Sequence, residues 1–131
     1  MDVLILTIQV LLSILLIVGA LFKLTMPYAK YSNIPSVAWS KEFKPAHIRL
    51  MGVFELAGGV GLVIPLFLNF LKIITPLAAV GIALYMAGAM ATHLRRSEYL
   101  HMAGNLVIFL MPALFIAYAT LVRIIGLDAS Q

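Results

Sequence analysis

The sequence contains no cysteine. This absence excludes disulfide bonds, thiolate-bound zinc, cysteine-ligated iron–sulfur clusters and thiol–disulfide exchange. Any redox role of the chain must therefore be free of thiol chemistry.

Charged side chains are scarce as well. They make up 11% of the 131 residues, and the 9 basic and 5 acidic ones leave a net charge of +4. A nucleic-acid surface would need a basic stripe interleaved with aromatic residues outside the apolar segments, and the sequence has none. We therefore predict no nucleic-acid partner and interpret the basic residues as signals of membrane topology.

Self-contained catalytic and cofactor motifs are also missing. The apolar segments hold no pair of carboxylates, no glycine-rich phosphate loop follows a strand, and no serine is placed with a histidine and an acid. His47, His93 and His101 lack the short spacing of zinc ligands and lie too near the ends of the apolar segments for a haem. The sequence thus predicts no metal site and contains no flavin or haem motif.

What the chain does contain is apolar surface. Hydrophobic residues make up 63% of it and the mean hydropathy is +1.09, whereas soluble domains hold about 45–50% apolar residues. Four segments approach the roughly 20 apolar residues that cross a bilayer, near residues 3–24, 47–68, 71–94 and 99–125. The first lacks the basic start of a signal peptide, so we expect it to be retained. We predict an all-α membrane protein, a single domain over residues 1–131 that forms an antiparallel four-transmembrane-helix bundle in the lipid bilayer.

Two details of the spans follow from their connections. Only a few residues separate the second span from the third, which predicts that these two are antiparallel neighbours. Pro112 lies in the middle of the fourth span and predicts a kink there.

The long first loop has the composition of a membrane interface. Residues 26–46 combine three prolines and three lysines with aromatic side chains. We expect a short interfacial helix capped by Ser36 and ending at Phe43. Its aromatic residues Tyr31, Trp39 and Phe43 are candidates for a lid.

Small residues mark the second and third spans. Gly58 and Gly59 lie together in the second, and Ala79, Ala83, Ala87 and Ala91 recur every four residues in the third. Because lipid offers no hydrophobic drive between helices, such residues matter by letting backbones approach closely. We predict that they pack helices within the bundle; a contact between copies of the chain is the alternative.

Glu55 is the most informative residue, since it lies about 12 Å into its span at 1.5 Å per residue. A carboxylate at the centre of a bilayer costs about 2.5–3.5 kcal/mol on insertion scales. Two interpretations stay open: a protonated or ion-paired glutamate that locks helices together, or a group that binds a ligand, proton or substrate.

Other polar residues accompany Glu55 in the same half of the bilayer. Helix direction places Lys23, His93, His101 and Asn105 there, while the opposite half is expected to be almost purely apolar apart from Asn69. Each has a simple structural explanation: Lys23 as a snorkelling side chain, His93 as an interfacial residue, His101 as a partner of Glu98. Their convergence nevertheless predicts one ligand-binding site, formed by Lys23, Glu55, His93, His101 and Asn105.

Several stretches together resemble the DoxX family of small bacterial four-helix membrane proteins. They are Gly19-Ala-Leu-Phe-Lys23-Leu, Gly52-Val-Phe-Glu55-Leu-Ala-Gly58-Gly59, the following Pro65, and Ala91-Thr-His93-Leu-Arg95-Arg96. The resemblance covers nearly the whole chain and implies a location in the bacterial cytoplasmic membrane. The family name comes from a subunit of thiosulfate:quinone oxidoreductase, so the resemblance implies at most a membrane subunit of a quinone-linked enzyme.

A more distant similarity links the chain to the endoplasmic-reticulum chaperone of nicotinic acetylcholine receptors. Lys23, Glu55 and His101 match that pattern. Two functional hypotheses follow. The chain is either an accessory protein that binds a small amphipathic, quinone-like ligand around Glu55, or a non-enzymatic chaperone or assembly factor that binds other membrane proteins through its helices.

The distribution of basic residues predicts orientation. The side holding the first and third loops collects most of them, namely Lys23, Lys30, Lys41, Lys44, Arg49, Arg95 and Arg96, against only Lys72 and Arg123 on the other side. By the positive-inside rule the loop side is cytoplasmic and both termini lie outside. A reporter enzyme active only outside the membrane should therefore be active when fused at Gln131, and a cytoplasmic signal there would contradict this orientation.

Overall fold

The computed structural model describes residues 3–68 and 72–126, and this part of the chain is helical without strands. Four helices are long and apolar enough to cross a membrane, as the sequence predicts. The largest difference from the expected bounds is at the third span, which begins at Ile74 rather than residue 71. The elements in order are α1 (Val3–Thr25), α2 (Tyr28–Ser32), η1 (Pro35–Glu42), α3 (Pro45–Phe67), α4 (Ile74–Arg95), α5 (Tyr99–Gly104), η3 (Asn105–Leu110) and α6 (Met111–Ile124).

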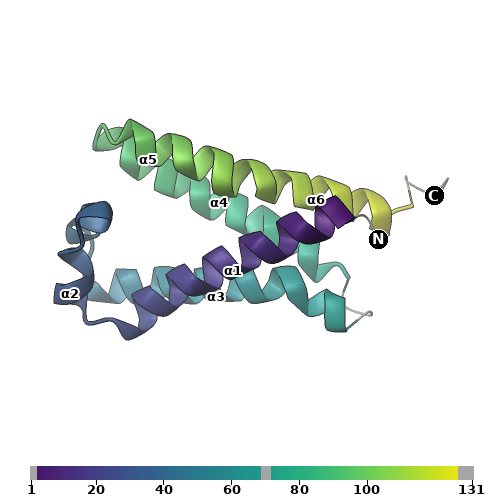
Figure 1. Cartoon of the computed structure of the whole chain (residues 1–131), viewed down its shortest axis with the longest axis horizontal. Helices are drawn as coiled ribbons and strands as arrows, with labels where there is room; N and C mark the ends of the chain where they lie inside the picture. Colours follow the sequence, from purple (N-terminus) through teal and green to yellow (C-terminus); the bar gives the residue numbers. More distant parts are fainter. Residues whose placement is uncertain (1–2, 69–71, 127–131) are drawn as a thin grey trace.

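The spans form two pairs that meet at one end and diverge at the other (Figure 1). Helix α1 packs along α3, and α4 packs along the fourth span, which α5, η3 and α6 build together. Helix α3 also contacts α4, which confirms that the second and third spans are neighbours. The start of α1 and the end of α6 lie at the closed end, whereas α2 and η1 bridge the open end (Figure 1).

The core is apolar, and so is the outside. Leu12, Leu16, Leu62 and Ile116 are fully buried where the helices meet. Large apolar side chains also cover the outer surface; Leu100, for example, is 85% exposed. In water such a surface would be unstable, whereas hydrocarbon solvates it, so the bundle fits a membrane environment.

Glycines in α3 set how closely its neighbours approach. A Cβ added at Gly59 would lie 2.8 Å from Ile17 Cγ1 and 3.1 Å from the backbone oxygen of Ser13, and one at Gly58 would lie 2.9 Å from Ile82 Cγ1. The Ser13 hydroxyl donates to the Gly59 carbonyl at 2.6 Å. Thus Gly59 faces α1 and Gly58 faces α4.

Only half of the alanine ridge of α4 packs within the bundle. Ala79 and Ala83 are buried, whereas Ala87 and Ala91 are exposed. A four-residue step turns an α-helix by about 40° more than one full turn, so positions repeating every four residues drift around its surface. The expectation that all four pack within the bundle is therefore wrong for the second half of the ridge.

The terminal-side half of the bundle is not as apolar as expected. Gln9 is buried there and donates to the Leu62 carbonyl from its amide nitrogen. The Thr75 hydroxyl donates to the same carbonyl at 3.3 Å. Polar side chains inside a span form hydrogen bonds with backbone carbonyls of neighbouring helices. The spacing of residues along the chain does not show which of them have such a partner. Asn69, the polar residue expected in this half, lies outside the described residues.

One local expectation needs correction. The short helix of the first loop exists as the 3-10 helix η1, but it starts at Pro35 and no side chain caps it, so Ser36 is not its N-cap. Proline fits the first position of a helix, which explains the earlier start. In the fourth span the π-helical segment η3 lies directly before Pro112, in the turn whose backbone hydrogen bonds a proline disturbs.

We expect Gly59→Ala to destabilise the bundle relative to Gly81→Ala. Both gain similar helix propensity, but a Cβ at Gly81 meets nothing within 4 Å, whereas one at Gly59 forces α1 away. Overpacking of this kind costs about 1–3 kcal/mol. Reversible unfolding in detergent measures the difference, and equal stability of the two variants would contradict the proposed close contact.

Candidate functional site

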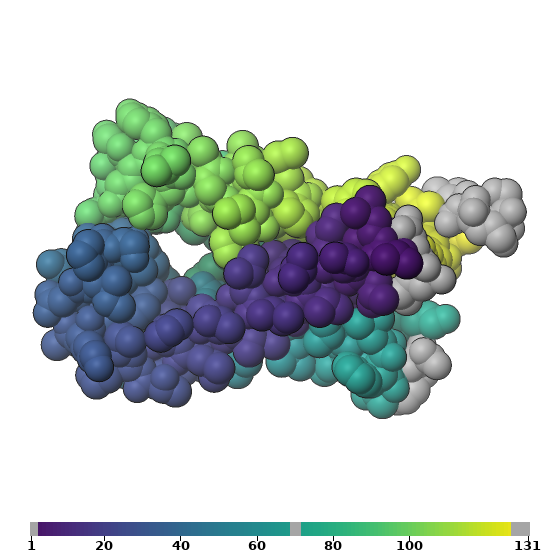
Figure 2. All heavy atoms as spheres, in the orientation of Figure 1, coloured from purple at the N-terminus to yellow at the C-terminus, as the bar shows by residue number. Residues whose placement is uncertain are grey.

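A cavity of ≈ 480 Å³ lies between the two helix pairs on the side of the first loop. Figure 2 shows an opening between this loop and α5. All four spans and η1 contribute to its walls. The predicted site residues Lys23, Glu55, His93, His101 and Asn105 all line it.

Glu55 lies at the centre of this site and is 7% exposed. The Lys23 ammonium donates to its Oε1 atom at 2.8 Å, and the Tyr85 hydroxyl donates to the same oxygen at 2.8 Å. Lys23 is thus buried and ion-paired, so the interpretation of Lys23 as a snorkelling side chain is wrong. The Lys23 ammonium does not extend to the headgroups, because Glu55 pairs with it inside the bundle.

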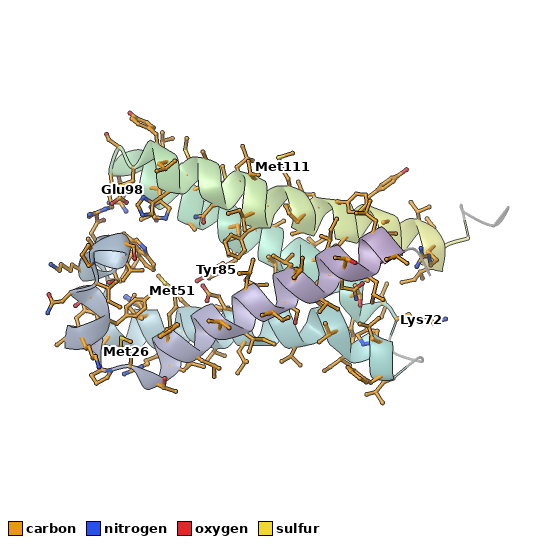
Figure 3. All side chains as sticks on the ribbon, in the orientation of Figure 1. Met26, Met51, Lys72, Tyr85, Glu98 and Met111 are labelled. Carbon is orange, nitrogen blue, oxygen red and sulfur yellow. The ribbon has the colours of Figure 1, made fainter. Side chains whose placement is uncertain are left out.

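Tyr85 is a member of the site that the sequence did not predict. It projects from the middle of α4 into the space between the helix pairs (Figure 3). Tyrosine is commonest at membrane interfaces, so its position in the middle of a span is the feature of the sequence that could have identified Tyr85 as a site residue.

The second carboxylate oxygen of Glu55 is unpaired among the described residues. Both hydrogen bonds to Glu55 end on Oε1. Oε2 faces Gly19 of α1, where a Cβ would lie only 3.1 Å from it. Both Gly19 and Glu55 line the cavity. The site therefore offers one free hydrogen-bond acceptor beside an apolar space.

Aromatic rings surround the Lys23 ammonium. The nitrogen lies 5.9 Å from the centroid of the Tyr31 ring and 5.8 Å from that of Trp39, within cation–π range. Burial raises the pKa of the Tyr31 hydroxyl, and the nearby Lys23 charge partly offsets this. Tyr31 is buried beside the cavity, whereas Trp39 and Phe43, the other two lid candidates, line it directly.

The two histidines form a stack at the loop end of the cavity. The His93 and His101 rings lie 5.1 Å apart at 24°, and Trp39 meets His93 edge to face. His93 Nδ1 lies 2.9 Å from Glu98 Oε1, so Glu98 pairs with His93 and not with His101 as expected. His101 Nε2 instead lies 3.2 Å from the Ser36 carbonyl, which can only accept, so this nitrogen carries the proton.

Asn105 lines the cavity at the start of the π-helical segment η3. Such segments widen the backbone helix and occur frequently at functional sites. Of the residues in this turn, Asn105 and Phe109 face the cavity.

The DoxX-like family matches the chain over residues 7–126, and thus over most of its length. The chain belongs to the DoxX-like family. No curated protein and no solved structure matches it.

In this DoxX-like protein an ionic latch holds the first loop over the cavity. Glu42, at the end of η1, accepts from Arg95 Nη1 at 2.6 Å and also from Arg96 Nη1. These guanidinium groups lower the pKa of the Glu42 carboxyl below its ordinary value of 4.5. The His93 ring and Arg96 lower the pKa of Glu98 as well. Glu98 lies beside the first loop (Figure 3). Within residues 3–68 and 72–126, no three acidic or histidine side chains gather as a metal site.

We expect acid to release the latch. A carboxyl with a lowered pKa stabilises the docked loop at neutral pH, and this contribution is lost as pH falls below 4.5 through the pKa of the docked state. Trp39 is the single tryptophan, so its emission should shift to the red on release. Glu42→Gln should show part of this red shift already at neutral pH, because a surface ion pair contributes little to stability and other contacts also hold the loop, whereas Lys41→Gln, on the exposed neighbour, should not shift. Wild-type emission from Glu42→Gln at neutral pH would disprove the latch.

Proposed function

We propose that this DoxX-like protein binds a small amphipathic, quinone-like molecule in the cavity around Glu55. The observation that carries the proposal is the carboxylate of the buried residue Glu55, which lines the cavity and whose Oε2 atom has no donor from the described residues. A buried ion pair that serves only stability is expected to satisfy its remaining lone pairs within the protein. A ligand hydroxyl supplies the missing donor.

The cavity also suits the remainder of such a ligand. Its volume of ≈ 480 Å³ lies within the range of about 300–1,000 Å³ typical of small-molecule sites. Leu16, Met86 and Phe109 provide apolar walls, and the Trp39 ring provides an aromatic surface. A planar ring with polar oxygens at its edge, as in a quinone, fits walls of this chemistry.

Titratable groups reach the cavity from all four spans. Glu55 and His101 are placed to exchange protons with a bound quinone or quinol, because both line the space that the ligand would occupy. The sequence has no flavin, haem or metal motif, so electrons for any quinone reduction would come from a partner protein. The proposed role is therefore that of an accessory subunit, in a bacterial cytoplasmic membrane with both termini outside.

A second candidate is a chaperone or assembly factor that binds another membrane protein. The observation in its favour is the exposed half of the alanine ridge, since Ala87 and Ala91 leave a helix face that a partner helix can approach closely. A second copy of this chain is one such partner. Under this candidate the Lys23–Glu55 pair is structural.

Decylubiquinol, the reduced form of decylubiquinone, is a suitable probe for the first candidate, because its hydroxyl groups can donate to Oε2. Isothermal titration calorimetry measures its dissociation constant. We expect Glu55→Gln to weaken its binding at least tenfold, since the amide replaces an acceptor of the ligand with a group that also donates. Because removing one partner of a buried ion pair costs about 3–5 kcal/mol, the double variant Lys23→Met, Glu55→Gln removes both charges and serves as the matched control for folding.

The outcomes separate the two candidates. Loss of binding in a folded double variant supports the ligand site. If both variants bind decylubiquinol as the wild type does and only their thermal stability falls, Glu55 is structural and the proposal is wrong. If the wild type binds no probe but co-purifies with one membrane protein, the chaperone candidate holds.

A further inference from the structure

A second cavity, of ≈ 510 Å³, lies on the outer surface between α3 and α4. The residues that form its two sides are Phe54, Ala57 and Gly58 from α3 and Ala78, Gly81 and Leu84 from α4. Phe54 and Leu84 are exposed at 58% and 71%, so the cavity is a groove open to the surroundings. Both helices are membrane spans, and the groove therefore faces the hydrocarbon of the bilayer.

This α3–α4 groove adjoins the Glu55 site. Leu16, Glu55 and Tyr85 line both cavities, so the hydrogen bond from Tyr85 to Glu55 lies between them. Glu55 is the only charged residue that lines the groove among the described residues. A molecule whose polar head contacts Glu55 thus has an apolar path beside it that leads out to the lipid.

Missing side chains keep the groove open. A Cβ at Gly81 would meet nothing within 4 Å, whereas one at Gly58 would lie 2.9 Å from Ile82 Cγ1. The helices therefore touch at Gly58 and leave unfilled space at Gly81, one residue before Ile82.

We infer that the α3–α4 groove holds the single hydrocarbon tail of the ligand whose polar head contacts Glu55. This inference rests on the proposed function and specifies the ligand class: a small hydrogen-bonding head on one long chain, which enters sideways from the bilayer. The acyl chain of a bulk phospholipid has the same chemistry. Its headgroup, however, stays at the interface, while Glu55 lies ten residues past Pro45, or about 15 Å along α3.

The test compares two probes on two variants in nanodiscs, with isothermal titration calorimetry as the readout. Decylubiquinol carries a tail, and dimethoxy-methyl-benzoquinol is the same hydroxyl-bearing head without one. Gly81→Leu fills the groove without a steric clash at its Cβ. Gly104→Leu is the matched control, because a Cβ there also meets nothing within 4 Å and Gly104 lines neither cavity.

We expect Gly81→Leu to weaken decylubiquinol binding at least tenfold, about 1.4 kcal/mol, and to leave binding of the tailless head unchanged. Gly104→Leu should bind both probes as the wild type does. If Gly81→Leu weakens the binding of both probes equally, or of neither, the tail does not occupy the groove. A phospholipid chain that fills the groove instead would leave the binding of both probes unchanged.

Two further outcomes are distinct. Failure of the wild type to bind either probe overturns the proposed function itself. Conversion of a dimer to a monomer by Gly81→Leu, measured by light scattering in detergent, would assign the groove to a second copy and overturn the inference while leaving the Glu55 site intact.

Discussion

The ion pair between Lys23 and Glu55 is the interaction on which the rest of the structure depends. Each charge alone would be costly in hydrocarbon, so both must meet inside the bundle. They come from α1 and α3, and their 2.8 Å contact fixes how these two helices are rotated against each other. Glycines make the contact possible: a Cβ at Gly52 would lie 3.1 Å from Lys23 Cβ, and one at Gly19 equally close to Glu55.

Close pairing of α1 with α3 has a consequence for the other pair. The fourth span meets α1 through α6 near the closed end, while α5 and η3 pack on α4. Space therefore remains between the pairs at the loop end, and the first loop covers it with Trp39 and Phe43. The hydrogen bond from Arg95, at the end of α4, to Glu42 holds this loop over the cavity.

Much of the fold was predictable because hydropathy acts locally along the chain. The four spans and the neighbouring second and third helices needed only the sequence. The expected one-sided polarity was only partly right, because Gln9 and Thr75 are polar and buried in the opposite half of the bundle. The alanine ridge failed at Ala87 and Ala91, because a four-residue repeat drifts around a helix. Tyr85 was not predicted as a site residue, because its partner Glu55 lies on another helix and nothing near Tyr85 in the sequence indicates that contact. The pairing of Glu98 with His93 instead of His101 turned on the conformation of the short third loop, where Ser97 adopts a positive φ of 60°.

By itself, the sequence determined that the chain has four membrane-spanning helices and predicted that Glu55 shares one end of the bundle with Lys23, His93 and His101. Length and polarity decide both, because a segment must match the thickness of the hydrocarbon and avoid unpaired charge. Only the tertiary structure decided that both hydrogen bonds to Glu55 from the described residues end on one oxygen and that Glu55 also lines the groove between α3 and α4. Helix rotation and the distance of approach set these features, and side chains from separate helices fix them together.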